Sequence, residues 1–389
     1  MNLRKYLPLL MLSQLTWAGQ LPEIPEDSGG LLLYVGKAPQ DEVKQLASIV
    51  SSPRLIGQIL IKDGADLKSS REQVAEQKTK GQLSVQTYNG SDIPVISSVA
   101  NIILCAEGAK IDQDEIMRAL APRGIAYIQK GEQWQKIVKP VPSDIDDWTH
   151  ALYNPANTVV SKDTKVGPPR RLQWMTGPGW SRSHEHMVSF NAMVSEGGIV
   201  YYIVDMGSRS AVALPARWTL IARDGFNGKE LWRKELPSWM NHMWPLKSGP
   251  TQIQRKLVAV DGKVYVTLGA LAPVSQLDGR TGKVLKTYEG TENVDEIILD
   301  NDQLIVHMSD HVKRREGYTH DMSHVWAAAG NARQRFAWTN EERTIVSINP
   351  ETGKTSWVYK APCIAMTMNM DKDKIYFFDG ANAQAISRK

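Results

Sequence analysis

One short phrase occurs three times in the second half of this 389-residue chain. The copies are Asp224–Trp232, Asp278–Lys286 and Asn349–Trp357. Each copy follows an apolar stretch, carries a glycine four residues after its first Asp or Asn, and ends four residues later on Trp or Lys. A phrase that recurs in this way predicts stacked copies of one supersecondary unit. We therefore expect this half of the chain to fold as a series of similar small units.

A second phrase supports this expectation, because a copy of it lies before each copy of the first phrase along the chain. It is a turn followed by β-branched and aromatic residues, which suit a packed, pleated surface. Four-stranded units repeated in this manner predict an all-β propeller, which closes by radial repetition. The copies of the second phrase are Gly198–Tyr201, Gly262–Tyr265, Asp302–Ile305 and Asp373–Tyr376.

The two phrases together resemble the pyrroloquinoline quinone repeat family, which includes the quinoprotein alcohol dehydrogenases. In that family the Trp that ends each repeat docks between neighbouring blades. The second copy departs from the pattern at Lys286, which implies one weakened docking contact. Arg171–Trp174 looks like the end of one more repeat. The last residues, Gln384–Lys389, look like the start of another, so we expect a partial propeller and a fragment of a longer protein.

Residues 29–140 predict a different fold, because apolar strands alternate there with helical patterns. This alternation is typical of a doubly wound, Rossmann-like α/β sheet. We place a Pro- and Gly-rich linker with a first propeller strand at 141–182, the partial propeller at 183–389 and an insertion at 310–342. The expected strands are 30–35, 55–61, 83–87, 100–105 and 124–128, and the expected helices are 41–49, 66–77 and 114–120, the last one ended by Pro122.

The phrase Glu115–Ile128 resembles the late part of class I S-adenosylmethionine-dependent methyltransferases. Those enzymes need a glycine-rich turn after the first strand, so that the backbone can approach the cofactor closely. At that point this chain has Val35–Pro39, with one glycine and a proline. Asp63 follows the second strand and is a weak candidate for holding ribose hydroxyls. We therefore expect a degenerate, structural domain, with an active methyltransferase as an alternative.

The N-terminus predicts export. Arg4 and Lys5 precede an apolar stretch that ends at Leu15, and Ala18 is a small residue at a cleavage position. This is the pattern of a secretory signal peptide over residues 1–19, which implies a periplasmic or extracellular protein. A group of large exported bacterial proteins joins a methyltransferase-like domain to this propeller, and Asp146–His150, Val166–Trp174 and Trp180–His186 resemble it.

Charge and cysteine content limit the partners. The chain carries 46 basic and 42 acidic residues, a net charge of +4 that does not indicate a nucleic-acid partner. No later stretch is apolar enough to cross a membrane.

Cys105 and Cys363 are the two cysteines, and we expect buried free thiols, with a disulfide as the alternative.

Histidines are the candidate metal ligands. His184 and His186 lie two residues apart, so on a strand both side chains would face one side. With His150 and His242 they form the predicted transition-metal set, which fits zinc, copper or iron. The alternative is that these imidazoles bond to neighbouring backbone at turns. Further candidates are Glu185 and Asp205, and two pairs at a spacing that suits one helix face are His307 with His311 and His320 with His324.

Trp180 and Trp218 are weak candidates for stacking on a quinone, and Trp239 and Trp244 are others. Family members that bind pyrroloquinoline quinone cap it with a vicinal disulfide, and this sequence has no adjacent cysteines. The favoured function is therefore a binding or scaffold protein whose propeller face meets a protein or glycan partner. The alternative is a quinone- or metal-dependent oxidoreductase with its site over the propeller centre.

Overall fold

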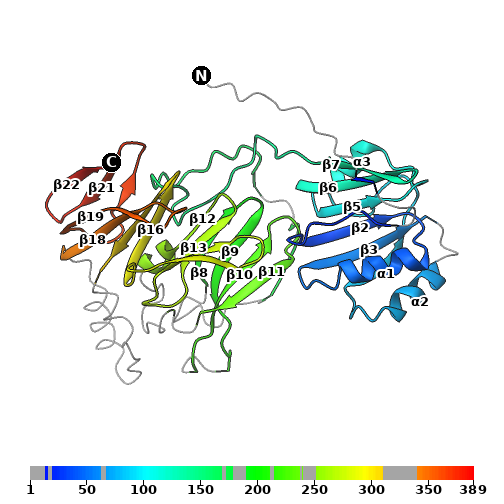
Figure 1. The fold of residues 1–389 in the computed structure, drawn as a ribbon, viewed down its shortest axis with the longest axis horizontal. Helices are drawn as coiled ribbons and strands as arrows, with labels where there is room; N and C mark the ends of the chain where they lie inside the picture. Colours follow the sequence, from blue (N-terminus) through cyan, green and yellow to red (C-terminus); the bar gives the residue numbers. More distant parts are fainter. Residues whose placement is uncertain are drawn as a thin grey trace. The chain divides into compact units, whose positions relative to one another are not determined.

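A computed structural model describes residues 14–15, 20–62, 67–168, 172–177, 190–210, 214–236, 239, 251–309 and 340–389 (Figure 1). The chain forms two compact units, which we describe one at a time. The first unit consists of residues 1–143 with 169–174 and 226–231. The second unit consists of residues 144–168, 175–225 and 232–389.

The first unit contains a seven-stranded sheet in the order β1-β7-β6-β5-β2-β3-β4. Strands β2 to β6 run parallel, β7 pairs antiparallel with β6, and β1 pairs antiparallel with β7. The order of β2 to β7 is the doubly wound, Rossmann-like order, so the α/β prediction is confirmed. The strands are β1 (Gln14–Leu15), β2 (Gly30–Val35), β3 (Leu55–Ile61), β4 (Leu83–Thr87), β5 (Ala100–Cys105), β6 (Leu120–Lys130) and β7 (Gln133–Val138).

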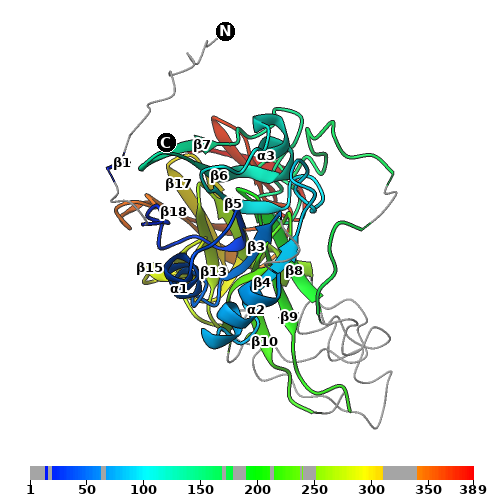
Figure 2. The same ribbon diagram turned by 90° about the vertical axis from the view of Figure 1, so that its right-hand side faces the viewer.

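Among the described residues of the first unit, three helices cover the two faces of this sheet. Helices α1 (Gln40–Ile49) and α2 (Leu67–Glu76) lie side by side, and their apolar side chains share one core with Leu32 and Ile59 (Figure 2). Helix α3 (Gln113–Ala119) packs on the other face, against Leu33. Successive strand residues point to opposite faces, which explains why the apolar runs of β2 and β3 are buried on both.

Pro122 does not end the third helix. Helix α3 stops at Ala119, and Pro122 lies inside β6. There the β5–β6 register shifts between the pairs Ala100–Leu120 and Ile102–Ile125, so the ladder does not need a donor from the proline. The hairpin strand β7 was not predicted from the sequence.

Within the described residues, the second unit contains four small antiparallel sheets, each built from strands in chain order. We number them one to four along the chain, and they form the green to red half of Figure 1. A 3₁₀ helix, η2 (Thr251–Lys256), precedes sheet two. The strands are β8 (Phe190–Glu196), β9 (Ile199–Asp205), β10 (Trp218–Asp224) and β11 (Glu230–Glu235); β12 (Leu257–Val260), β13 (Lys263–Thr267), β14 (Val274–Asp278) and β15 (Val284–Tyr288); β16 (Val294–Asp300), β17 (Gln303–Met308), β18 (Glu342–Ile348) and β19 (Thr355–Pro362); and β20 (Asn369–Met370), β21 (Lys374–Phe378) and β22 (Ala383–Ser387).

The repeated phrase forms the turn between the third and fourth strands of a sheet. In sheet two, Asp278 Oδ1 accepts a hydrogen bond from the backbone N–H of Thr281 at 2.8 Å, and Asn349 Oδ1 does the same for Thr352 at 2.8 Å in sheet three. The glycine that follows has a positive φ, 71° at Gly282. A left-handed residue is needed there, and glycine adopts that conformation without a Cβ clash. The turn therefore explains why each copy of the phrase begins with Asp or Asn and has a glycine four residues later.

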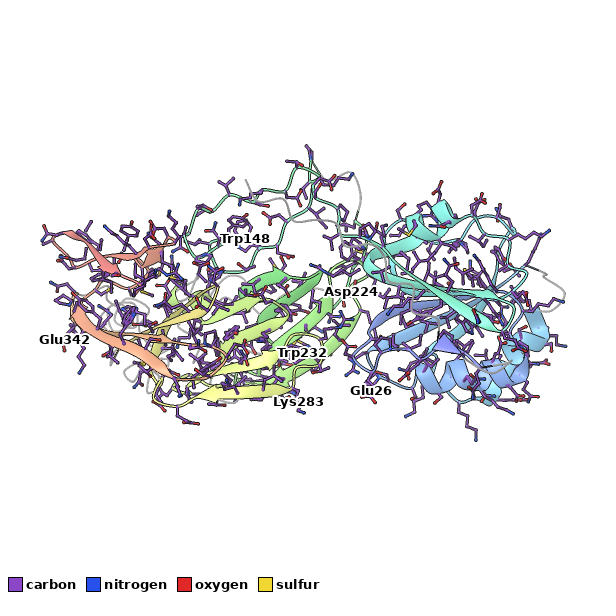
Figure 3. All side chains as sticks on the ribbon, turned by 45° about the horizontal axis from the view of Figure 1, so that its top comes forward. Glu26, Trp148, Asp224, Trp232, Lys283 and Glu342 are labelled. Carbon is purple, nitrogen blue, oxygen red and sulfur yellow. The ribbon has the colours of Figure 1, made fainter. Side chains whose placement is uncertain are left out.

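The last residue of the phrase contacts the next sheet. Trp232 Nε1 donates to the carbonyl oxygen of Gly279 at 2.8 Å, and Trp357 Nε1 donates to that of Arg388 at 3.0 Å (Figure 3, where Trp232 is labelled). Lys286 takes the same part, because its Nζ donates to the carbonyl oxygen of Pro350 at 3.3 Å. The docking contact expected to be weakened at Lys286 is therefore present. Its donor is an ammonium in place of an indole.

Trp174 packs in the same way within the first unit. A Cβ added at Gly228 would lie 2.5 Å from the Trp174 ring, and one added at Gly282 would lie 2.6 Å from the Trp232 ring. The two rings thus cover equivalent glycines of the phrase. This packing agrees with the interpretation of Trp174 as the end of one more repeat.

Both cysteines are free and buried, as expected: Cys105 lies in the first unit and Cys363 in the second. Burial raises the pKa of each thiol to about 12. Among the described helices, none is long and apolar enough to cross a membrane.

Candidate functional site

The loop after β2 is the place where a Rossmann-like sheet binds a cofactor. Gly36 lies in this loop with φ of 137°, and a Cβ there would come within 2.8 Å of the Ala106 side chain. The loop is also tied to both neighbouring strands, because Gly36 N–H donates to Leu60 O at 2.9 Å and Ala106 N–H donates to Val35 O at 2.9 Å. The backbone is therefore packed tightly against its own sheet.

Side chains close the loop further. Tyr34 Oη donates to the carbonyl oxygen of Lys37 at 3.1 Å and to Glu42 Oε2 on the first turn of α1. Burial raises the pKa of the Glu42 carboxyl, and the hydrogen bond from Tyr34 opposes that rise. Pro39 precedes α1 and offers neither an N–H nor a capping side chain. Asp63, the predicted ribose-binding residue, lies outside the described residues.

The second unit carries a group of buried charges where the first strands of its sheets begin. We call Arg255, Lys256, Asp295, Glu296, His307 and Arg343 the amino-end cluster; each is at most 6% exposed. Arg255 and Lys256 end η2, directly before β12, and Asp295 and Glu296 are near the start of β16. Helix η2 packs against both β8 and β16, which brings the charges of sheets two and three together.

Two ion pairs organise the amino-end cluster. Arg255 Nη1 donates to Glu296 Oε1, and Arg343 Nε lies 3.7 Å from Asp295 Oδ2. Removing such charges from water is costly even when they are paired. Sheet one has Asn191 at the equivalent register shift, so the repeat itself does not require charges at this point. Buried charges that the fold does not need are typical of functional sites.

Glu296 is the residue of the amino-end cluster whose side chain can take up and release a proton. It lies directly opposite His307 in the β16–β17 ladder, beside a β-bulge of the kind that often re-aims side chains near active sites. Burial raises the pKa of Glu296 to about 6, against the lowering effect of Arg255 and with a further rise from Asp295. A carboxyl with this pKa can exchange a proton near neutral pH.

Three buried polar atoms around this group have no hydrogen-bond partner within the described part of the chain: Glu296 Oε2, Thr267 Oγ1 and Trp239 Nε1. Lys256 lies beside one of these residues, since its Nζ is 5.9 Å from the centroid of the Trp239 ring, and the same Nζ donates to Ala270 O at 3.4 Å. The cluster thus offers acceptors, donors and a cation at one end of the first strands.

The opposite ends of the first strands are covered by one segment. We call residues 146–158 the strap; Trp148 on it is labelled in Figure 3. The strap bonds to all four sheets in order. Ser195 N–H donates to Trp148 O at 2.8 Å, Ala259 N–H to Thr149 O at 3.0 Å, Leu299 N–H to His150 Nε2 at 3.1 Å and Met370 N–H to Pro155 O at 3.0 Å.

His150 is buried in the strap and uses both ring nitrogens. Because Nε2 accepts from Leu299 N–H, the proton is on Nδ1, which lies 2.8 Å from Thr149 Oγ1. Burial lowers the pKa of His150 to about 3, so the ring is neutral. This geometry follows the structural alternative for His150, an imidazole bonded to backbone.

The other predicted metal ligands, His184, His186 and His242, lie outside the described residues, as do His311, His320 and His324. Over the described ranges, no three His, Cys, Asp or Glu side chains group as metal ligands. The metal site stays a prediction. His307 lies in strand β17, so the helical spacing expected for it with His311 is wrong.

Of the quinone-stacking candidates, Trp180 and Trp244 lie outside the described residues. Trp218 is buried at the start of β10, opposite Asp205, and Trp239 is buried beside Lys256. Sequence reasoning missed the amino-end cluster. Its one signal was the pair of charged dipeptides, Arg255-Lys256 and Asp295-Glu296, set at the start of apolar strands.

No protein-family model matches the chain, and no curated protein matches it. Solved structures with a similar fold cover 26% of the chain, in its N-terminal part. They include YjhP of Escherichia coli (13% identity, TM-score 0.22, 42% of that chain covered), the [4+2]-cyclase SpnF (16%, 0.23, 39%) and geranyl diphosphate C-methyltransferase of Streptomyces coelicolor (13%, 0.23, 39%). The chain spans less than half the length of these proteins, and the Rossmann-like description of the first unit rests on its strand order.

Proposed function

We propose that the second unit is part of a β-propeller of the pyrroloquinoline quinone repeat type, and that it acts as a binding module. The repeated docking contact supports the propeller: Trp232, Lys286 and Trp357 each donate to a backbone carbonyl oxygen just beyond the third strand of the following sheet. The strand order supports it too, because sheets one to three are four-stranded meanders joined in sequence.

The single observation that carries the binding function is the contrast between the two ends of the first strands. The strap satisfies backbone groups at one end, whereas the amino-end cluster puts charges and unpartnered buried atoms of the described chain at the other. Within the described residues, a partner that approaches along the first strands meets the strap at one end and the amino-end cluster at the other. We propose that a glycan or protein partner binds at this end.

Glu296→Gln is the test, because the amide has nearly the same shape, removes the negative charge and keeps one acceptor oxygen for Arg255. We expect correctly folded variant protein to lose binding of the glycans that the wild-type chain retains on a glycan array. Lys283→Gln, at an exposed turn of sheet two, is the control and should bind like wild type. Equal binding by Glu296→Gln and wild type would falsify the assignment of this end.

We propose further that the first unit is a degenerate Rossmann-like domain that does not use S-adenosylmethionine. The Tyr34–Glu42 hydrogen bond and Pro39 occupy the loop in which a cofactor needs close backbone approach. Residues that fit S-adenosylmethionine are thus missing from the described loop. Isothermal titration with millimolar S-adenosylmethionine should give no heat of binding, and saturable binding would overturn this proposal.

The second candidate function is an oxidoreductase, favoured by Glu296, whose pKa of about 6 suits a proton acceptor. The free, buried Cys105 and Cys363 cannot form the vicinal disulfide that caps pyrroloquinoline quinone in its known binders, so this chain does not fit that mode of binding. Metal analysis and absorption spectra of purified protein separate the candidates. Stoichiometric metal or quinone would favour the oxidoreductase over the binding module.

Export remains a proposal from the N-terminal pattern. Fusing residues 1–19 to a reporter enzyme that is active only outside the cytoplasm tests it. Activity that disappears when Arg4 and Lys5 are replaced by Glu would support export.

A further inference from the structure

A cavity in the first unit lies at the amino ends of β2 and β3, at the other end of the strands from the Tyr34–Glu42 loop. Its volume is about 530 Å³. Pockets for small molecules occupy roughly 300 to 1,000 Å³. Its wall is the irregular segment 21–28, which ends in a turn at 25–28, and its floor is the last turn of α1 with the turn at 51–55.

The wall is held in place by hydrogen bonds along its length. Leu21 N–H donates to Gln45 Oε1 at 2.9 Å, and Tyr127 Oη donates to the carbonyl oxygen of Glu23 at 3.3 Å. Just before the wall, Trp134 Nε1 donates to Gln20 O at 3.0 Å. Because side chains from α1, β6 and β7 hold the backbone at residues 20–23, the cavity is a built feature of the unit.

The charged groups that line the cavity have both signs. Arg54 donates to the carbonyl oxygens of Glu26 and Ser28 through two of its five N–H groups, so its guanidinium is fixed at one end of the wall. The carboxylates of Glu23 and Glu26 belong to exposed residues on the same wall. The carboxyl end of α1 adds partial negative charge to the floor.

The remaining lining is apolar or weakly polar. Leu21, Ile24, Ile49 and Leu55 contribute hydrocarbon surface, and Ser48 and Ser52 contribute hydroxyls. An occupant therefore meets one cation, two anions and apolar side chains in a space of small-molecule size.

We propose that this cavity binds a small zwitterion with apolar side chains, such as a short apolar peptide. Its carboxylate would pair with Arg54, since guanidinium and carboxylate form strong, directional hydrogen bonds. Its ammonium would lie toward Glu23, whose backbone is held by Tyr127, and toward the carboxyl end of α1. Its side chains would lie against Leu21 and Leu55. This site is separate from the amino-end cluster and does not depend on the function proposed for the second unit.

Isothermal titration of the full chain with the dipeptide leucyl-leucine tests the proposal. We expect saturable binding that weakens about tenfold or more when the probe is N-acetylated or C-amidated, because each change removes one charge. No binding at millimolar dipeptide overturns the proposal. Equal binding of the free and blocked dipeptides also overturns it.

Two variants add an independent check that keeps the wall intact. Glu23→Gln leaves the backbone bond from Tyr127 untouched, and we expect it to weaken binding of leucyl-leucine but not of the acetylated probe. Glu72→Gln on α2, outside the cavity, should bind like wild type. Equal effects of the two variants would contradict the assigned role of Glu23.

Discussion

At the scale of single residues, the glycine of the repeated phrase has two separate tasks. Gly282 adopts a positive φ, and it also leaves room for the Trp232 ring. Gly262 has nearly the same φ, 72°, but nothing lies within 4 Å of the position of an added Cβ. The pair therefore separates the cost of backbone strain from the cost of lost ring packing.

We predict that Gly262→Ala lowers the free energy of unfolding by about 1 kcal/mol, the cost of a left-handed alanine. Gly282→Ala should cost about 1 to 3 kcal/mol more, because the new methyl group overpacks against Trp232. Urea unfolding of the two variants measures the difference. If both variants lose the same stability, Trp232 packing on Gly282 contributes nothing to docking.

His150 should make stability depend on pH. Its pKa falls from 6.5 in the unfolded chain to about 3 in the folded one, so the fold favours the neutral ring. This stabilisation is fully present above pH 6.5 and is lost as the pH falls toward 3. No charged group is among the causes of this shift; they are burial and the bond from Leu299 N–H.

We predict that the free energy of unfolding drops by about 1 kcal/mol between pH 7 and pH 5.5 through this residue. Urea titrations of wild type and His150→Gln at pH 7 and pH 5.5 measure this effect. It is the loss of unfolding free energy between the two pH values in wild type, minus the same loss in His150→Gln. The glutamine keeps a hydrogen-bonding side chain that does not titrate. A pH dependence that survives unchanged in His150→Gln would assign it to other groups.

At the scale of elements, the strap is an irregular segment of the second unit that bonds to all four of its described sheets. It supplies one acceptor to the first strand of each sheet, at the backbone amides of Ser195, Ala259, Leu299 and Met370. A segment that bonds to every sheet should open only when several of these bonds open together.

We predict that hydrogen exchange of the amides of Ala259, Leu299 and Met370 is slow and similar in the native protein. His150→Ala should speed exchange at Leu299 most, since it removes the acceptor of that amide. Exchange resolved to single residues by NMR checks this. Fast exchange of Met370 alone in wild type would show that the strap is not one cooperative element.

The sequence could predict features that follow local patterns, and it could not predict features that depend on contacts between distant residues. Strands such as Gly30–Val35 and the turn at Asp278 follow local rules, which are apolar runs and a side-chain cap with a left-handed glycine. The strap has no such period, because its bonds join His150 to Leu299 and Asn157 to Met368, far apart along the chain. The pairing of Arg255 with Glu296 likewise depends on how η2 packs on β16, which no local pattern contains.

At the scale of the whole molecule, each unit contains one cysteine in its core. Both thiols have pKa values raised to about 12 by burial, and thiols react as thiolates, so neither should react in the folded chain. Each thiol therefore reports on the opening of its own unit.

We predict that a thiol reagent labels neither cysteine in native protein and both in urea. Cys105→Ser and Cys363→Ser variants, labelled during a urea titration, give a separate midpoint for each unit. Different midpoints would show that the two units unfold independently. Rapid labelling of either cysteine without denaturant would contradict the burial described here.

Lys286 has a consequence for how proteins of this kind are detected. The docking contact requires a donor long enough to reach the next turn, and an ammonium meets that requirement as an indole does. A sequence pattern that requires an aromatic residue at this position detects only the repeats whose docking donor is an indole. Repeats that use lysine would go uncounted, and the number of units in such chains would be underestimated.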